Sequence, residues 1–299
     1  MQFPDFDPAI FTIPALHLGG LTVGPLSVRW YALAYITGIL LGWRYAVSLV
    51  RSPKLWGARG ATLTSPQIDD LVLWITLGVI LGGRIGYILF YMLVDPQQRA
   101  ELFAHPLEVF EVWNGGMSFH GGMIGVGVAL AWFARTNRVD LFLLADLVAP
   151  CEPIGQFFGR MANFINGELW GRKTSLPWGM VFCNRHIELA SGGTCPAGLD
   201  PRHPSQLYEA GLEGIALFLL LRWATHHAHW LQRRGAVAGL FLVGYGAARF
   251  ALENVRNPDI GMPDFPFGLT MGMMLSLPMI AGGAWLLWRG LREPAEARA

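Results

Sequence analysis

The segment from Gly159 to Gly171 gathers residue types that can bind a polar ligand. It follows a long apolar stretch and contains Arg160, Asn163, Asn166 and Glu168. Charged and amide groups are costly to desolvate at the edge of a bilayer. An arginine offers a planar fork of donors that fits phosphate oxygens, and the asparagines suit ester carbonyls or hydroxyls. We expect this segment to bind a lipid headgroup; the alternative is an interfacial arginine that only reaches water.

A second polar group lies toward the C-terminal end of the chain. Tyr245, Arg249, Glu253 and Arg256 are spaced by four, four and three residues, so on a helix they form one stripe. Glu253 lies between the two arginines and can neutralise only one of them. About one positive charge is then left over, which predicts an anionic ligand. The alternative is a buried charge network that only holds helices together.

A histidine at the outer start of an apolar segment is a candidate for proton transfer. His120 precedes Gly121 and Gly122, and the two glycines would let a substrate approach closely. The ordinary pKa of imidazole, about 6.5, suits proton transfer at neutral pH. The alternative interpretation is a histidine that is hydrogen-bonded at the membrane interface.

The motif from His203 to Glu209 leads into another apolar segment. Ser205 is placed to cap that helix, with Tyr208 and Glu209 in its first turn. A cap and an interfacial anchor explain the motif at least as well as catalysis does. His203 and Ser205 lack the Gly-x-Ser-x-Gly setting of a nucleophile dyad.

Two further residues gain interest from their position. Tyr31 opens the first apolar segment as an ordinary interfacial anchor, and it matters only if it reaches the polar cluster. Arg84 lies inside the second segment and needs a partner at that depth. We expect this partner to be Glu108, Glu111 or Asp146, or the ligand itself.

The composition predicts a membrane protein built of many helices. Of 299 residues, 53% are hydrophobic and 14% are charged, whereas soluble domains carry about 25% charged residues. The formal charge of +1 does not indicate nucleic-acid binding. Segments long enough to span a bilayer lie at roughly 28–49, 69–93, 119–135, 140–158, 206–223, 236–254 and 269–289. We therefore expect an all-α polytopic membrane protein with about seven transmembrane helices.

Basic residues predict how these segments are oriented. Lys and Arg concentrate on the side of the membrane that holds the C-terminus, which places that end in the cytoplasm and the N-terminus outside. The membrane body then comprises residues 1–158 and 206–299, with a small outer head at 159–205. Cys183 and Cys195 lie in that head without zinc-site spacing. They could form a disulfide if the head faces an oxidising compartment.

Together these motifs resemble the prolipoprotein diacylglyceryl transferase family of the bacterial inner membrane. They run in order through most of the chain, and the segment at 159–171 is highly specific. The matching segments are Val28-Arg29-Trp30-Tyr31, His120-Gly121-Gly122, Gly159 to Gly171, His203 to Glu209, and Tyr245 to Arg256.

The resemblance implies a reaction and its partners. Members transfer the diacylglyceryl group of phosphatidylglycerol to the lipobox cysteine thiol of a prolipoprotein, forming a thioether and releasing glycerol 1-phosphate. It also implies seven spans with a periplasmic head. We expect phosphatidylglycerol, the lipobox segment and membrane lipids as partners, with no cofactor or metal.

The expected roles of the site residues combine the resemblance with the chemistry of each side chain. Arg160 and Arg249 would hold the phosphate, and His120 would act as the thiol base or help to activate it. Tyr31 would contact the lipid. The residues expected to shape and polarise the site are Asn163, Glu168, Tyr245, Glu253 and Arg256.

Two other classes of function remain as alternatives. A membrane transporter of an organic anion would also place arginines within the membrane. The absence of visible repeats in the sequence counts against it. A structural scaffold would use the charged residues for assembly alone.

Overall fold

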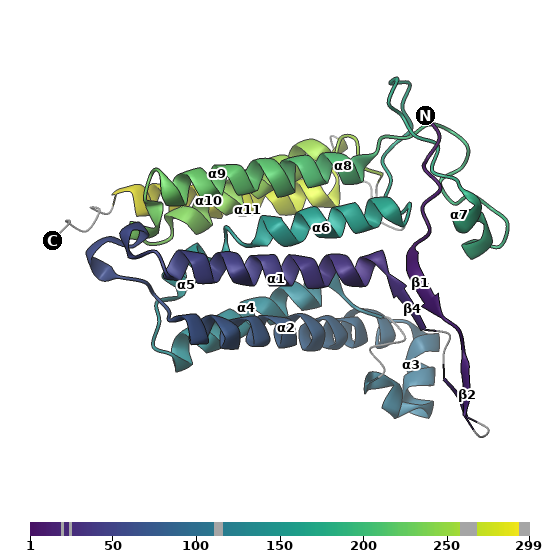
Figure 1. Ribbon diagram of the computed structural model, residues 1–299, viewed down its shortest axis with the longest axis horizontal. Helices are drawn as coiled ribbons and strands as arrows, with labels where there is room; N and C mark the ends of the chain where they lie inside the picture. The colour runs from purple at the N-terminus through teal and green to yellow at the C-terminus, as the bar shows by residue number, and fades with distance from the viewer. Residues whose placement is uncertain (19–20, 24–25, 111–115, 258–267, 293–299) are drawn as a thin grey trace.

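The computed structural model describes residues 1–18, 21–23, 26–110, 116–257 and 268–292 of the chain. The protein is mostly helical, and its helices lie side by side with their long axes roughly aligned (Figure 1). The helices are α1 (Trp30–Val50), α2 (Ser65–Tyr87), α3 (Pro96–Ala104), α4 (Phe119–Thr136), α5 (Leu141–Val148), α6 (Glu152–Ile165), α7 (Arg185–Ala190), α8 (Ser205–Glu209), α9 (Leu217–His226), α10 (Ala236–Leu252) and α11 (Met271–Arg292). Shorter helical segments are η1 (Pro53–Leu55), η2 (Gly57–Arg59), η4 (Pro106–Phe110), η7 (Trp230–Gln232) and the π-helical η3 (Ile88–Met92) and η6 (Ala210–Ala216).

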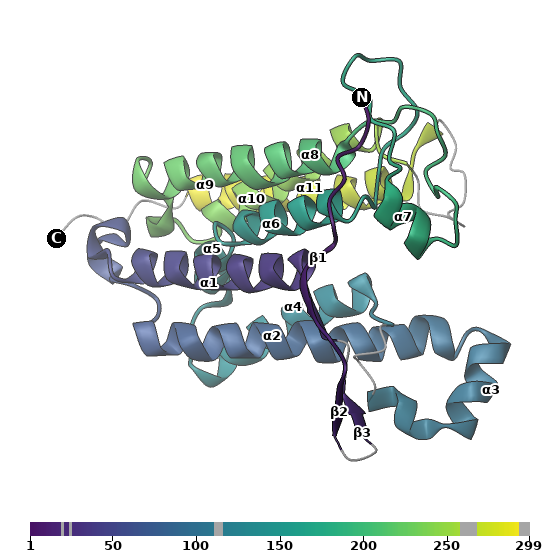
Figure 2. The same cartoon turned by 45° about the vertical axis from the view of Figure 1, so that its right-hand side comes forward.

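Two short antiparallel ribbons precede the bundle. Strand β1 (Ala9–Ile13) pairs with β4 (Leu26–Arg29), and β2 (Leu16–Leu18) pairs with β3 (Leu21–Val23). These ribbons and α3 project from the end of the bundle at which α7 also lies (Figures 1 and 2). The strand β4 runs directly into α1.

The helices form two layers joined by α1 and α5. On one side α2 packs against α4; on the other, α6 packs against the α8–η6 segment and α10 packs against α11. Helix α1 lies between the layers and contacts both α6 and α2. Glycines allow the closest approach, since a Cβ on Gly82 would lie 2.7 Å from the Cα of Gly125. Small residues therefore let the backbones of α2 and α4 pack closely together.

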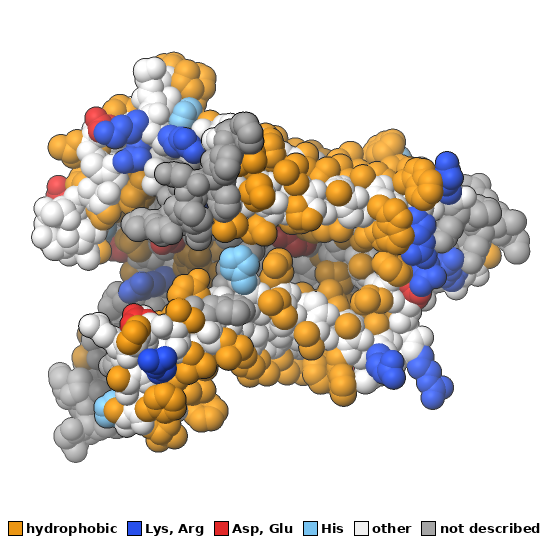
Figure 3. Space-filling model, turned by 180° about the vertical axis from the view of Figure 1, so that it is seen from behind, with side chains coloured by type: hydrophobic (Ala, Val, Ile, Leu, Met, Phe, Trp, Pro, Cys, Tyr) orange, Lys and Arg blue, Asp and Glu red, His pale blue; other side chains and the backbone are white. Residues whose placement is uncertain are grey.

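Each of the seven apolar segments predicted from the sequence contains a helix, although 28–29 belong to β4 and a turn at 149–151 interrupts the segment 140–158. Within the described residues, α1 and α11 are each long and apolar enough to cross a membrane, and α5 with α6 makes a third candidate if that bent pair is one span. This pair bends by 43°, close to Pro150 and Pro153, because proline cannot continue the helical hydrogen bonding. Hydrophobic side chains cover the length of the bundle, and basic side chains gather at the C-terminal end (Figure 3).

The last helix in the predicted apolar segment at 140–158 extends beyond the end of that segment. Helix α6 continues to Ile165 and carries Arg160 and Asn163 on its last turns. The polar residues that suggested a loop are tolerated because they bond to neighbouring helices, as described below. Arg160 and Asn163 therefore lie within one turn of the same helix.

Residues 166–204 form a compact unit at one end of the bundle. Its buried residues Phe182, Ile187 and Ala197 form one cluster with Phe164 of α6 and with the N-terminal residue Phe3. The Phe3 ring lies 5.4 Å from that of Phe164 and 5.1 Å from that of Phe182. The chain therefore closes this unit with its own N-terminal segment.

Candidate functional site

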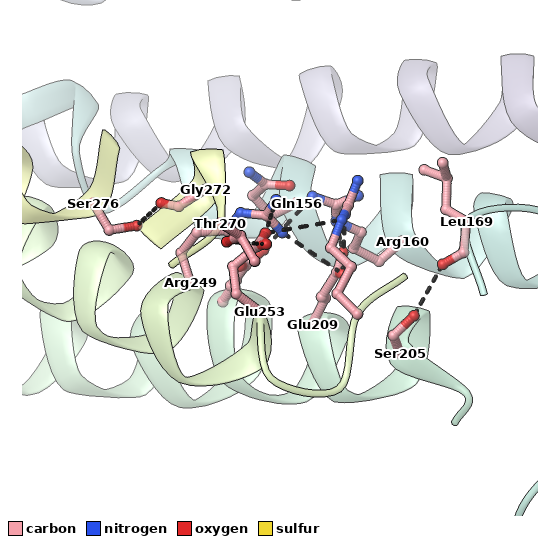
Figure 4. Close-up of polar contacts among 12 residues, drawn as sticks. Gln156, Arg160, Leu169, Ser205, Glu209, Arg249, Glu253, Thr270, Gly272 and Ser276 are labelled. Atoms are coloured by element: carbon pink, nitrogen blue, oxygen red, sulfur yellow. Dashed lines mark hydrogen bonds and ion pairs between the residues drawn. The ribbon is translucent and has the colours of Figure 1, made fainter. Parts of the chain in front are cut away.

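The carboxylate of Glu209, at the end of α8, joins three arginines. Arg160 on α6 places Nε 2.7 Å from Oε2 of Glu209. Arg256, just beyond α10, places Nη1 3.2 Å from Oε1, and Arg249 on α10 places Nη1 3.9 Å from the same oxygen. Figure 4 shows the arginines and the carboxylates converging between the helices. The structure thus brings together residues that are far apart in the sequence.

Two more carboxylates complete the cluster. Glu253 pairs with Arg249 one helical turn earlier, and its Oε1 lies 4.0 Å from Nε of Arg256. Glu213 in η6 lies 3.7 Å from Nη2 of Arg160. Within the described residues, three glutamates therefore face three arginines, whereas the sequence prediction counted one glutamate and two arginines. The count from one helix was incomplete, because Glu209 and Glu213 reach the cluster from another segment.

The two kinds of charge differ in exposure. The side chains of Arg160, Arg249 and Arg256 are 16%, 18% and 10% exposed, whereas those of Glu209, Glu213 and Glu253 are 1%, 0% and 6% exposed. A ligand that approaches the cluster therefore meets guanidinium groups before carboxylates. Each guanidinium has five N–H donors, so the ion pairs of Arg160 and Arg249 leave donors for an additional anion.

The helix that supplies Glu209 and Glu213 departs from α-helical geometry. The segment η6 is π-helical and begins immediately after Glu209. Such π-helical turns are rare and occur frequently at functional sites. Sequence spacing did not identify Glu213, although an acidic residue in an apolar segment was a usable signal.

The predicted cap at Ser205 is wrong. Ser205 is the first residue of α8, and its hydroxyl donates to the carbonyl of Leu169 at 2.9 Å. Next to it, the Gln206 amide donates to the carbonyl of Glu168 at 2.5 Å. Both side chains therefore fix the turn that follows α6. They donate to main-chain carbonyl groups, which need a hydrogen-bond donor when they are shielded from water.

A second polar group lies around Asn163 at the end of α6. The amide of Asn163 lies 2.9 Å from Oε1 of Glu168 and 3.2 Å from the hydroxyl of Tyr31 on α1. The Asn166 amide lies 3.4 Å from the same oxygen of Glu168. Tyr31 therefore reaches the predicted cluster. The turn is sharp, with Leu169 in the left-handed region at φ 57°.

Tyr245 lies deeper in the bundle on the same helix as Arg249. Its hydroxyl lies 3.5 Å from the amide nitrogen of Gln156, which is one turn before Arg160 on α6. This contact extends the polar interface between α6 and α10 along both helices. Of the predicted stripe, Tyr245 and Arg249 lie on α10, but the helix ends at Leu252, so Glu253 is its C-cap and Arg256 lies beyond it.

His120 lies at the same end of the bundle but on the other layer. It is in the first turn of α4 and is exposed, and the side chain of Ser118 caps that turn by accepting from the main chain of Gly121 at 3.2 Å. The arginine cluster is contributed by α6, α8, η6 and the end of α10. The role of His120 as a base remains a prediction.

Arg84 is buried and contacts main-chain oxygens. Its Nε donates to the carbonyl of Val109 at 2.8 Å and its Nη1 to that of Gly116 at 3.2 Å, and it also donates to the carbonyl of Glu108. Of the predicted partners, Glu108 thus contributes its main chain. Glu111 lies outside the described residues.

The third predicted partner of Arg84, Asp146, holds another helix. Its carboxylate accepts from the main-chain N–H groups of Gly235 at 2.6 Å and Ala238 at 2.8 Å. Those N–H groups lie at the start of α10, where a carboxylate is favoured by the helix dipole. Asp146 therefore fixes the position of α10 against α5.

The two cysteines of the outer unit form a disulfide. Cys183 and Cys195 are joined, with their Cα atoms 5.4 Å apart. Among the described residues, the one group with metal-ligand spacing is these cysteines with Glu188. Because a disulfide has no thiolate to offer, this group is not a metal site in the oxidised protein.

Beside the arginine cluster, His203 lies in the loop that precedes α8. Its Nδ1 lies 3.3 Å from the hydroxyl of Tyr208, which also accepts from Nε1 of Trp178 at 2.7 Å. Partial burial lowers the pKa of His203 from its ordinary value, because desolvation disfavours the charged imidazolium. His203 is therefore neutral at neutral pH.

A hollow between the two layers opens on one face of the molecule, with acidic side chains in its wall (Figure 3). The fold and the site define a mostly helical membrane protein whose polar side chains meet at one end of its bundle. The family model described as prolipoprotein diacylglyceryl transferase matches residues 20–289. The chain belongs to this family of polytopic membrane proteins.

Similar proteins cover nearly the whole chain. It is 63% identical over 296 residues to the phosphatidylglycerol–prolipoprotein diacylglyceryl transferase of Caulobacter sp. (strain K31), covering 98% of this chain and 96% of the relative. The protein of that name in Phenylobacterium zucineum (strain HLK1) is 57% identical over 302 residues, covering 100% and 99%. That of Cereibacter sphaeroides (strain ATCC 17029 / ATH 2.4.9) is 46% identical over 305 residues, covering 98% of each.

Proposed function

We propose that this chain transfers the diacylglyceryl group of phosphatidylglycerol to the lipobox cysteine of a prolipoprotein. Membership of the family and the names of its relatives support this activity over anion transport. The observation that carries the proposal for the site is the convergence of Arg160, Arg249 and Arg256 on the buried Glu209. Arginines fixed in this way offer an anionic headgroup a rigid set of donors.

The reaction explains why cations are needed. The cysteine sulfur forms a bond to a glyceryl carbon of the lipid, and the bond from that carbon to a phosphate oxygen breaks. The leaving glycerol 1-phosphate thereby gains a second negative charge, and the thiol loses its proton. Arginines fixed before the reaction stabilise this developing charge in a water-poor site.

Arg160 and Arg249 bind the phosphate in this proposal. Their carboxylate partners hold both guanidinium groups in place, so little reorganisation is needed when the lipid arrives. His120 accepts the thiol proton or assists its removal, since a free thiol has a pKa of about 8.5 and reacts as the thiolate. Tyr31 contacts the lipid. The side chains that shape and polarise the site are Asn163, Glu168, Tyr245, Glu253 and Arg256.

The same proposal includes an arrangement in the bacterial inner membrane. The seven helical segments span the bilayer, with residues 1–158 and 206–299 as the membrane body and 159–205 as the periplasmic head. The N-terminus is periplasmic and the C-terminus cytoplasmic. The disulfide between Cys183 and Cys195 supports this orientation, since disulfides persist in the oxidising periplasm.

The test uses purified protein in detergent with phosphatidylglycerol and a lipobox peptide. Mass spectrometry of the peptide should show addition of one diacylglyceryl group in the absence of any membrane gradient. Arg160→Ala and Arg249→Ala should each lower kcat/KM by about 100-fold or more, as expected when a group that stabilises transition-state charge is lost. Arg292→Ala, at the opposite end of the bundle, is the matched control and should retain activity. If the wild type modifies no peptide, the proposed function is wrong.

A further inference from the structure

Within the described cluster, Glu253 is the carboxylate that accepts a side-chain hydrogen bond from the residue preceding α11. Thr270, immediately before α11, donates its hydroxyl to Oε2 of Glu253 at 2.7 Å. The opposite oxygen, Oε1, faces Arg249 and Arg256. One oxygen of Glu253 therefore accepts from Thr270 while the other pairs with the arginines. The bond from Thr270 fixes the orientation of the carboxylate toward the arginines (Figure 4).

The Thr270 hydroxyl is itself fixed by the helix. It accepts from the main-chain N–H of Met273 at 3.2 Å while it donates to Glu253. Because a hydroxyl has one proton, this N–H bond directs that proton toward the carboxylate. Threonine thus acts both as the cap of α11 and as a donor to the site.

Gly272 provides a second, independent constraint on the same carboxylate. A Cβ at this position would lie 2.9 Å from Cγ of Glu253 and nearer still to its carboxyl group. Only a residue without a side chain leaves room for Glu253 in its present position. Thr270 therefore bonds to Glu253, and the first turn of α11 packs tightly against it at Gly272.

We infer that Thr270 and Gly272 are positioning residues for the transfer reaction, acting through Glu253 on Arg249 and Arg256. The inference rests on the proposed function, because that proposal assigns Arg249 to the lipid phosphate and has Arg256 polarise the site. Neither residue needs to touch the substrate. Their effect is to keep the arginines in one orientation, so their loss should lower kcat more than it changes KM for phosphatidylglycerol.

The experiment compares four substitutions at these two positions. Thr270→Val removes the donor at constant shape, and Thr270→Ser restores it. Thr270→Asp keeps an acceptor for the cap but places a second carboxylate against Glu253. Gly272→Ala adds the Cβ that the carboxyl group excludes. Thr76→Val is the matched control, because the Thr76 hydroxyl donates to the carbonyl of Val72 in its own helix at 2.8 Å.

We expect kcat to fall by about 10-fold or more in Thr270→Val and Gly272→Ala, as is usual for groups that orient ligating side chains. The kcat of Thr270→Asp should be the lowest, although the aspartate still caps α11. Thr270→Ser and Thr76→Val should stay within about twofold of wild type. The melting temperature of every variant is measured as well. If Thr270 served only as a helix cap, its loss would lower the melting temperature but would not produce the order of kcat values given above.

Two results would overturn the inference. One is wild-type kcat in Thr270→Val or Thr270→Asp in a preparation whose wild type is active. The other is a fall in kcat that correlates with the fall in melting temperature across all variants, including Thr76→Val. A wild-type preparation that transfers nothing would instead defeat the proposed function, and the inference would fail with it.

Discussion

Replacing Glu209 by glutamine removes the shared negative charge from the centre of the arginine cluster while keeping the shape of the side chain. The Glu209 side chain is 1% exposed and lies 2.7 Å from Arg160 and 3.2 Å from Arg256. Removing one partner of a buried ion pair costs about 3–5 kcal/mol, because the other charge is left buried and unpaired. Glutamine still offers an oxygen acceptor, so we expect the lower end, about 3 kcal/mol of unfolding free energy.

This loss is large enough to measure by thermal unfolding in detergent. At about 2 °C per kcal/mol, Glu209→Gln should melt roughly 6 °C below the wild type. The same variant should lose most of its transferase activity, since Arg160 and Arg249 are no longer held by a common carboxylate. Glu188→Gln, an exposed glutamate in α7, is the matched control and should change unfolding free energy by less than about 0.5 kcal/mol.

A double-mutant cycle separates ion pairing from a general loss of packing. Arg256→Gln alone should destabilise the protein, because it leaves the Glu209 carboxylate short of one partner. Combined with Glu209→Gln it should cost less than the sum of the two, with a coupling of about 1–3 kcal/mol. Additivity within about 0.5 kcal/mol would refute the claim that these two charges depend on each other.

Three further predictions concern the base, the disulfide and pH. His120→Gln should lower turnover and change its dependence on pH; near-normal turnover from about pH 6 to about pH 9 would exclude the base role. Replacing Cys183 and Cys195 together by serine removes a crosslink across a separation of 12 residues and should cost about 3 kcal/mol by loop entropy; a melting temperature unchanged by reductant in the wild type would contradict this. Burial lowers the pKa of His203 in the folded state, so the unfolded chain binds its proton more readily and stability should fall as pH drops below about 6.5. His203→Gln should weaken that fall, and an identical pH profile of melting in the variant would show that His203 does not contribute.

Local patterns in the sequence predicted the helices and the residues that share a face. Apolar segments long enough to span a bilayer must be helical, because lipid offers no partner for main-chain N–H and C=O groups. The spacing of Arg249 and Glu253 likewise predicted that they share a face, and the structure finds them paired at the end of α10, with Glu253 as its C-cap. Such inferences hold because they depend only on helical periodicity.

The central role of Glu209 was not predictable in the same way. Its partners Arg160 and Arg249 lie on other helices, and spacing along one helix does not determine which helices pack against each other. The π-helical turn after Glu209 also changes the face on which Glu213 lies. The predicted cap at Ser205 failed because Pro204 occupies the N-cap position, which makes Ser205 the first residue inside α8.

The most direct measurement of the central claim is a structure of this protein with phosphatidylglycerol bound. The account predicts phosphate oxygens about 2.8 Å from guanidinium nitrogens of both Arg160 and Arg249, with Glu209 still buried behind them. A phosphate bound elsewhere in an active preparation, with both arginines engaged only by carboxylates, would contradict it.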